Sequence, residues 1–372
     1  MLMLHKVIIT VSLVQSNILS KMIGVLKMNI NKRKKVYEAL KRHSFEITMD
    51  LEEQIRNSKL PMIKDTLHII HESEIHYIIK YHFKMILVAF YFEKATFFLE
   101  YQLWLYRVYF FKEVNLDFFI FLNRLFEEVC KKYILKKDCL EIESLSNELE
   151  NEHENLKKEA SYKRYILEDT QAEDFAKNLI IGNNHYITDF FNKKVSNINE
   201  FLEIYNTTIS NAMKYVGFKW EANEISVAKE HIATNTLEEV ILSIIENLKE
   251  SEDKDKHIFL TAAPHEYHGL AIKIAALVYR KLGYKVTSLG TSMPTKEIKK
   301  AIMEFKPDYI IFSATLKASL IDIALIIDEI KKDKKIFPQN LVIGIAGAAF
   351  ENIINPSKLF KTDFYLNKLE EI

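Results

Sequence analysis

A short turn, "AAPHEYHGLA" over residues 262–271, places Glu266 and His268 two residues apart. An imidazole can ligate a metal through one nitrogen while a carboxylate holds the other nitrogen by a hydrogen bond. The turn follows an apolar run and precedes an amphipathic one, so we expect it to join a strand to a helix. The pair therefore indicates a metal-ligating imidazole at a strand end.

Two further strand ends carry small or polar residues. The segment "SATL" contributes Ser313 and Thr315, and "GIAGAAF" contributes Ala346 and Gly347. Small residues let a ligand lie close to the backbone, and open parallel sheets bind ligands outside the carboxyl ends of their strands. A lone histidine in a loop is more often structural. Its coincidence with these two strand ends favours a large, flat ligand that carries a metal.

The last third of the chain alternates strand and helix patterns. Near-continuous apolar runs such as "YIIFS" and "LVIGIAG" are typical of a parallel sheet covered on both faces. We therefore predict an α/β domain over 256–372, a doubly wound, flavodoxin-like parallel sheet of about five strands. The sequence contains no GxGxxG or GxxxxGK motif, which argues against a dinucleotide site or a P-loop NTPase. Strands are expected at 257–262, 285–289, 308–313, 340–345 and near 363, and helices at 269–282, 295–304 and 317–331.

Glycine and proline divide the chain into two architectures. Residues 1–256 contain three glycines and one proline, whereas residues 257–372 contain five of each. Both residue types mark turns and strand ends, so the first part is expected to be all-α.

Four segments precede the α/β domain. Crowded aromatic residues in 60–130 indicate helices packed on several sides, and His82 among them is either a core residue or a ligand of haem or another chromophore. The segments are a disordered or wrongly assigned start (1–28), an aromatic-rich helical domain (29–136), a charged helical linker (137–168) and a four-helix-bundle cap (169–252). The linker is either a solvated helix or a short coiled coil or signalling helix, since its apolar residues keep an approximate a/d pattern.

Composition excludes several function classes. Lys and Arg together number 51, as do Asp and Glu, so there is no basic surplus and we expect no direct nucleic-acid binding. Cys130 and Cys139 match neither a disulfide framework nor a metal-site spacing, which favours a reducing cytoplasm. The most apolar stretch, 85–111, is interrupted by charged residues, so we predict a cytoplasmic protein without a membrane partner.

The second helical segment holds three more candidates. Ser226 is expected to cap the helix that carries Glu230 and His231, and Trp220 precedes it. Consecutive helix residues point about 100° apart, so Glu230 and His231 can border one cleft. Taken alone, Trp220 is a packing residue and Glu230 is an early-helix acid that suits the dipole.

Together these motifs resemble the cobalamin (B12)-binding domains, and among them the sensor part of cobalamin-dependent, light-responsive transcriptional regulators. The E-x-H-x-x-G turn appears as "EYHGLA", the S-x-T/L strand end as "SATL" and the Gly-Gly edge as "AG". Ala271 and Ala346 therefore stand in place of two glycines. Upstream, W-x9-EH followed by "IAT" is similar to the signature of the helical cap in those sensors. The resemblance covers residues 170–372.

The resemblance implies a role for each matching residue. His268 would be the lower cobalt ligand, with Glu266 as its hydrogen-bond partner and Gly269 in the same turn. His231 would approach cobalt from above once an adenosyl group is lost. The residues expected to meet the upper ligand are Trp220, Glu230 and His231, and those expected to line the slot for the nucleotide tail are Ser313, Thr315, Ala346 and Gly347.

The resemblance also implies a function. We expect adenosylcobalamin as the cofactor, with methylcobalamin or hydroxocobalamin as alternatives, and a sensor rather than an enzyme. No helix-turn-helix pattern is recognised in the N-terminal part, so the expected output is contact with a transcriptional regulator, a kinase or another copy of the chain. The alternatives are a corrinoid methyl carrier and a non-photochemical cobalamin or redox module. The Glu-x-His turn, in place of Asp-x-His-Asp, and the bulk of Trp220 argue against the carrier.

Overall fold

The computed structural model describes residues 30–161, 169–333 and 337–372, which form two compact units. Helices α2 to α8 belong to unit 1 and, apart from residues 221–223, everything from residue 169 onward belongs to unit 2. The prediction of a disordered or misassigned start over 1–28 lies outside the described residues.

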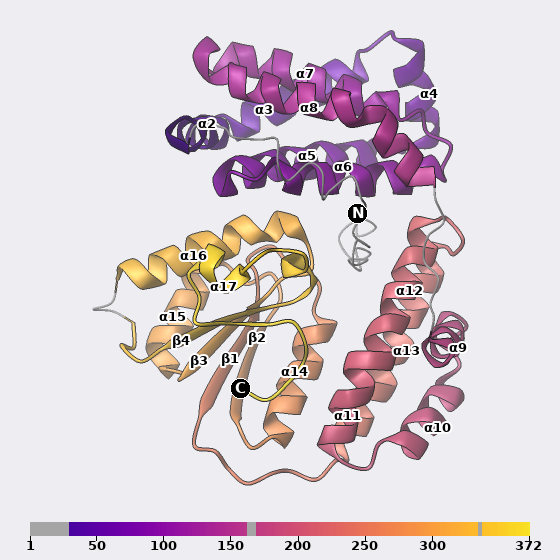
Figure 1. Cartoon of the computed structure of the whole chain (residues 1–372), viewed down its shortest axis with the longest axis vertical. Coiled ribbons are helices and arrows are strands. Elements are labelled where there is room, and N and C mark those ends of the chain that lie inside the picture. The colour runs from indigo at the N-terminus through magenta and orange to yellow at the C-terminus, as the bar shows by residue number, and fades with distance from the viewer. Residues whose placement is uncertain (1–29, 162–168, 334–336) are drawn as a thin grey trace. The chain divides into compact units, whose positions relative to one another are not determined.

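Unit 1 is made of helices, as the scarcity of glycine and proline predicts (Figure 1). Among the described residues, no helix has the length and apolarity that crossing a membrane requires. The helices are α2 (Ile30–Arg42), α3 (Ser44–Arg56), α4 (Pro61–Ile69), α5 (Glu72–Phe92), α6 (Ala95–Phe110), α7 (Asp117–Tyr133) and α8 (Lys136–Ser161).

The core of unit 1 is aromatic, because α5 and α6 bury residues on nearly all sides. His82 lies within this core and is 1% exposed. Its ring meets the rings of Phe98, Tyr101 and Phe126 at centroid distances of 5.2, 5.9 and 6.2 Å. Burial lowers the pKa of His82 to about 3, so its imidazole is neutral. His82 is thus packed as a core residue.

Helix α8 differs from the solvated linker expected over 137–168. Ile142, Leu145, Leu149 and Leu156 are each no more than 4% exposed, and α8 packs against α6 and α7. Most of the charged residues that suggested a linker lie on the other faces of the helix, although Glu159 is buried. An apolar stripe of this kind is buried wherever a partner helix is available. Residues 136–161 are therefore part of unit 1, and 162–168 lie outside the described residues.

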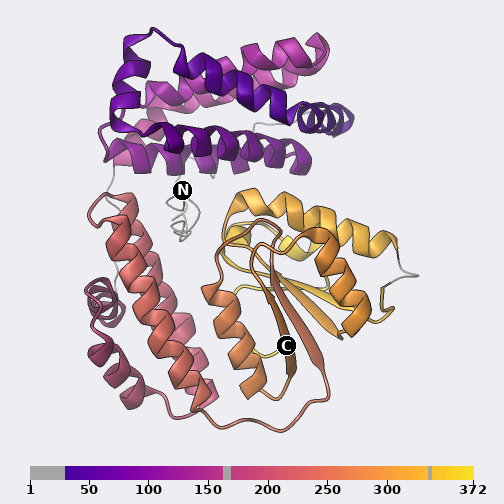
Figure 2. The same cartoon turned by 180° about the vertical axis from the view of Figure 1, so that it is seen from behind.

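The first half of unit 2 consists of helices that begin at polar caps. Asp169, Asn183, Asn197 and Ser226 each accept a backbone N–H of the first turn that follows. The expected cap at Ser226 is therefore confirmed. These cap helices, drawn beside the sheet in Figure 2, are α9 (Thr170–Ile180), α10 (Asn184–Lys194), α11 (Ile198–Ile204) continuing through a π-helical turn (Tyr205–Ile209) into α12 (Ser210–Glu221), and α13 (Val227–Glu246).

The second half of unit 2 is a five-stranded sheet in the order β2-β1-β3-β4-β5, with all neighbours parallel. Helix α14 covers one face and α15 and α16 the other, so the predicted doubly wound fold is confirmed (Figure 1). The elements are β1 (His257–Ala262), α14 (Leu270–Lys281), β2 (Lys285–Gly290), α15 (Thr295–Phe305), β3 (Tyr309–Ser313), a 3-10 turn (Lys317–Ser319), α16 (Leu320–Lys332), β4 (Val342–Ala346), a second 3-10 turn (Ala348–Phe350), α17 (Pro356–Phe360) and β5 (Phe364–Leu366).

The cap and the α14 face of the sheet share one hydrophobic core. Helix α13 packs against α14, and buried residues such as Leu237, Ile241 and Ile274 belong to the same cluster. Asn206, in the π-helical turn, adds a polar tie: its side chain accepts from the backbone N–H of Leu369 at 3.0 Å and donates to the carbonyl at 2.8 Å. Fully buried apolar area is the main stabilising contribution to such an arrangement. The cap is therefore built onto the sheet.

The segment 247–256, which connects α13 to β1, passes close to the C-terminal end of α14 and to Gly283 just beyond it. The Gly283 carbonyl accepts from Lys254 N at 2.9 Å, and Lys281 O accepts from Ser251 N at 2.8 Å. Gly283 has φ +87, and a Cβ there would lie 1.9 Å from the carbonyl oxygen of Glu252. Both the backbone conformation and the close approach require glycine.

Replacing Gly283 by alanine is therefore expected to destabilise the protein strongly. Gly290 provides a matched control, because it also has positive φ (+71) but has nothing within 4 Å of the added Cβ. We expect Gly290→Ala to cost about 1 kcal/mol from backbone strain alone. Gly283→Ala is expected to cost at least about 2 kcal/mol more, because the clash adds an overpacking penalty. Urea unfolding followed by circular dichroism measures both, and equal losses would contradict the steric account.

Candidate functional site

The strand order places a topological switch point between β1 and β3. Chain connections leave these two neighbouring strands in opposite directions, and such points are where open α/β sheets bind ligands. The loop after β1 carries Glu266 and His268, and the loop after β3 carries Thr315. The predicted residues therefore lie on the two loops that flank the switch point.

Glu266 joins these loops through its carboxylate, which is 1% exposed. Its Oε2 accepts from the backbone N–H of Thr315 at 3.2 Å and of Leu316 at 3.1 Å, and from Ser319 Oγ at 3.1 Å. Its backbone carbonyl accepts from Ser292 N at 2.8 Å, which ties in the loop after β2. One buried glutamate thus connects the loops that follow three strands, through its carboxylate and its backbone carbonyl.

The other oxygen of Glu266 orients His268. Oε1 accepts a short hydrogen bond from His268 Nδ1 and a further bond from His268 N at 3.3 Å. Burial opposes ionisation of Glu266, but the hydrogen bond and charge of His268 and the backbone donors outweigh it, so the pKa lies below the usual value. Glu266 is therefore a carboxylate that holds the imidazole in one orientation.

The remaining nitrogen of His268 is the most unusual atom of the site. Nε2 is buried and has no hydrogen-bond partner among the described residues. Buried polar atoms are nearly always paired, so one without a partner indicates a function or a bound group. With Nδ1 engaged by a carboxylate, Nε2 has the geometry of a metal-ligating histidine.

The third predicted strand end, that of β4, lies beside the end of β3 because the two strands are paired. Ser313 pairs with Ala262 on one side and with Ala346 on the other. Gly347 has φ +105, and a Cβ there would lie 2.4 Å from the carbonyl oxygen of Ala314. Gly269 is less constrained, with Thr291 Cγ2 at 3.0 Å from the added Cβ. The positive φ and the close approach of the Ala314 carbonyl both require glycine at position 347, whether or not a ligand is bound.

The cap contributes Glu230, whose side chain is 1% exposed. Thr234 Oγ1 donates to Glu230 Oε1 at 2.9 Å, while Oε2 is buried without a hydrogen-bond partner among the described residues. His231 Nδ1 lies 4.0 Å from Oε2. Burial raises the pKa of Glu230, and the Thr234 hydrogen bond and the charges of His231 and His268 offset only part of that effect. Glu230 is thus a buried acid whose charged form is only partly compensated by its neighbours.

For Trp220 the structure gives no contact with the other predicted site residues, all of which lie in the described part of the chain. It is half-buried, one residue before the end of α12. Thr234 belongs to the predicted "IAT" motif but was given no role there, and Ser319 was not predicted; their hydroxyls donate to the carboxylates of Glu230 and Glu266. Thr234 lies four residues after Glu230 on one helix, a spacing at which side chains meet, whereas no local signal marks Ser319.

Residues 171–243 match the family model of the B12 binding domain. The matched segment runs from α9 into α13 and includes Trp220, Glu230 and His231. The chain therefore contains a B12 binding domain.

Known proteins resemble larger parts of the chain. The HTH-type transcriptional repressor CarH of Myxococcus xanthus is 26% identical over 148 residues, which are 40% of this chain and 48% of that protein. The match thus spans about half the length of the repressor. The monomethylamine corrinoid protein of Methanosarcina barkeri has 16% identity and a TM-score of 0.44, covering 54% of this chain and 93% of that one. A cobalamin-binding protein from Desulfitobacterium hafniense DCB-2 has 18% identity and a TM-score of 0.30, covering 53% and 93%.

The residues at the switch point fit a cobalt corrinoid. One imidazole supplies one ligand, which suits a metal whose equatorial positions are filled by a macrocycle, as for haem. His268 has one nitrogen held by a carboxylate and the other buried and free of hydrogen bonds within the described part of the chain. The half-buried Ser313 and Ala346, paired with each other at the ends of β3 and β4, add little bulk there.

Glu230 is expected to lower the stability of the ligand-free protein at neutral pH. An acid whose pKa is raised by folding binds its proton more tightly in the folded state, so stability falls as pH rises from its unfolded value to its folded value. We expect Glu230→Gln to be more stable than the parent protein at neutral pH. The difference should vanish as the pH falls toward 4.5, the usual value of a glutamate.

Glu246→Gln is the control for this measurement, because Glu246 lies at the end of the same helix and is exposed. Urea unfolding of the three proteins across the pH range compares their free energies of unfolding. A stabilisation by Glu230→Gln that is independent of pH, or an equal effect of Glu246→Gln, would refute burial of the charge as the cause.

Proposed function

We propose that this protein is a cobalamin-binding sensor, with adenosylcobalamin as its cofactor and light as its signal. The observation that carries the proposal is His268 Nε2, a buried imidazole nitrogen without a partner in the described residues, on a ring whose other nitrogen is held by Glu266. The match of residues 171–243 to the B12 binding domain supports the choice of cofactor.

His268 would bind the metal from the sheet side, and Glu266 would set the basicity of its imidazole. A carboxylate on Nδ1 keeps Nε2 unprotonated and directed at the metal. Glu266 is itself anchored by donors from Thr315, Leu316 and Ser319, so the imidazole has little freedom to turn. In this proposal Ser313, Ala346 and Gly347 line the slot for the nucleotide tail.

Trp220, Glu230 and His231 of the cap would contact the upper ligand of the cofactor. Trp220, Glu230 and His231 all lie within the segment that matches the B12 binding domain. With Oε1 of Glu230 taken by Thr234, only Oε2 remains to receive a donor from a bound group. A hydroxyl-bearing upper group such as adenosyl would supply that donor, and a buried acceptor gains most when it is paired.

Light sensing follows if loss of the upper group changes the preferred position of the cap. Bound adenosylcobalamin would supply a cobalt to carbon bond that visible light can break. A ligand shifts a conformational equilibrium only through different affinities for the two states. Glu230 and His231 provide the difference, because they would contact the upper group in one cap position and lose that contact in the other.

The output proposed is a protein contact, with a transcriptional regulator, a kinase or another copy of this chain. Similarity over half of a transcriptional repressor supports a regulatory role rather than catalysis. The formal charge is zero, so the chain lacks the net positive charge that favours binding to DNA.

The first test is the absorption spectrum of the full chain mixed with adenosylcobalamin in the dark. We expect the wild-type spectrum to differ from that of free cofactor, because an imidazole ligates cobalt. His268→Ala is expected to lose this spectral change and to bind at least about tenfold more weakly. His265→Asn is the matched control, since His265 lies exposed in the same loop at φ +63, a conformation that Asn tolerates. Identical spectra and affinities for wild type and His268→Ala would refute the proposed ligand.

The second test measures the cap before and after illumination. We expect hydrogen exchange in α12 and α13 to increase once the adenosylcobalamin complex is fully photolysed, because the contacts to the upper group are lost. The hydroxocobalamin complex, which has no organic upper group, is the control and should not change. Unchanged exchange after complete photolysis would contradict light sensing, and methyl transfer from bound methylcobalamin to an acceptor would point to a carrier instead.

A further inference from the structure

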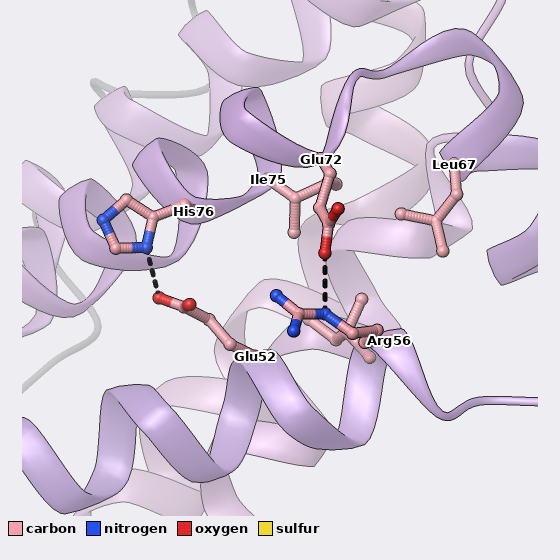
Figure 3. Close-up of a pocket in the computed structure, with 7 residues that line it drawn as sticks. Glu52, Arg56, Leu67, Glu72, Ile75 and His76 are labelled. Carbon is pink, nitrogen blue, oxygen red and sulfur yellow. Dashed lines mark hydrogen bonds and ion pairs between the residues drawn. The ribbon is translucent and has the colours of Figure 1, made fainter. Parts of the chain in front are cut away.

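Unit 1 contains a pocket of about 370 Å³ between α3, α4 and α5 (Figure 3). That volume lies at the small end of the range for ligand pockets, which begins at about 300 Å³. Ile55 and Ile75 are almost fully buried and Leu67 is half-buried, so they provide an apolar floor. The pocket is also lined by four titratable side chains, those of Glu52, Arg56, Glu72 and His76.

The four polar side chains form two close pairs that differ in exposure. His76 Nδ1 lies 2.5 Å from Glu52 Oε1, and the Glu52 side chain is only 15% exposed. Arg56 Nε lies 2.7 Å from Glu72 Oε1, with both side chains 65% exposed. An ion pair as exposed as the second stabilises weakly, so a ligand group can displace Glu72 at little cost.

Arg56 keeps its best binding edge open. Only its Nε is bonded to Glu72, and Figure 3 shows the two terminal nitrogens turned away from that carboxylate. Neither terminal nitrogen has a hydrogen-bond partner among the described residues. The two terminal nitrogens of a guanidinium bind a carboxylate in a bidentate manner. Arg56 is therefore placed to receive a ligand carboxylate.

The charge balance requires more than an anion. Glu52 and Glu72 place two carboxylates beside the single guanidinium of Arg56, so an anion alone would add to the negative charge there. A cation alone would leave the open edge of Arg56 unused. A zwitterion places its carboxylate on Arg56 and its ammonium near Glu52 and Glu72, and it adds no net charge. Its apolar part can cover the floor.

We propose that this pocket binds a free α-amino acid with an apolar side chain. The carboxylate contacts Arg56, the ammonium contacts the two glutamates, and the side chain packs on Ile55, Leu67 and Ile75. The site gives unit 1 a small-molecule ligand of its own. It does not depend on cobalamin binding by unit 2.

Calorimetric titration of the full chain with L-leucine tests the proposal. Two analogues separate its parts: 4-methylpentanoate lacks the ammonium, and 3-methylbutylamine lacks the carboxylate. We expect leucine to bind and each analogue to bind at least about tenfold more weakly, because each loses a charged hydrogen-bonding group. Arg56→Gln and Glu52→Gln should each weaken leucine binding by a similar factor.

Lys132→Gln is the matched control variant, because Lys132 forms another exposed ion pair of unit 1, 2.9 Å from Asp50 and outside the pocket lining. It should leave leucine binding unchanged, and circular dichroism verifies that all variants are folded. The proposal is overturned if leucine shows no binding at about 10 mM, a concentration well above a millimolar Kd. It is also overturned if 4-methylpentanoate binds as tightly as leucine, or if Arg56→Gln binds leucine normally.

Discussion

The candidate site depends on one buried carboxylate. Glu266 accepts hydrogen bonds from the loop after β3 through Thr315 and Leu316, and from Ser319 at the start of the following helix. Taking this charge out of water is costly, and it is tolerated because both oxygens are satisfied by donors. The result is a rigid junction at the switch point. The Nδ1 of His268 is hydrogen-bonded to the same carboxylate, so the orientation of its imidazole is fixed as well.

A second constraint is the shared core of unit 2. Because α13 packs against α14, the helix that carries Glu230 is positioned by the same apolar cluster that covers the sheet. Glu230 and His268 come from segments that are far apart in the chain, yet both belong to unit 2. Both present a buried polar atom with no partner in the described residues. Two such atoms are costly for the ligand-free protein, and functional sites commonly carry this kind of local instability.

Unit 1 differs from unit 2 in the composition of its core. Its core is built from aromatic rings on α5 and α6, and the imidazole of His82 is neutral within it. The apolar stripe of α8 completes this core, and most of the charged residues of α8 lie outside that stripe. In the pocket between α3, α4 and α5, by contrast, Arg56 and Glu72 form a pair in which both side chains are 65% exposed.

The sequence by itself determined the features that depend on neighbouring residues. Apolar runs and the positions of glycine and proline predicted the alternating strands and helices of 257–366, and Ser226 predicted a helix start, because these signals act over a few residues. The adjacency of Glu266 and His268 was equally local. Tertiary structure decided what depends on distant contacts. Ser319 reaches Glu266 from 53 residues away, and α8 is buried only because α6 and α7 offer it an apolar surface. A single sequence cannot reveal such partners, since side-chain burial is a property of the packed elements and not of the chain segment alone.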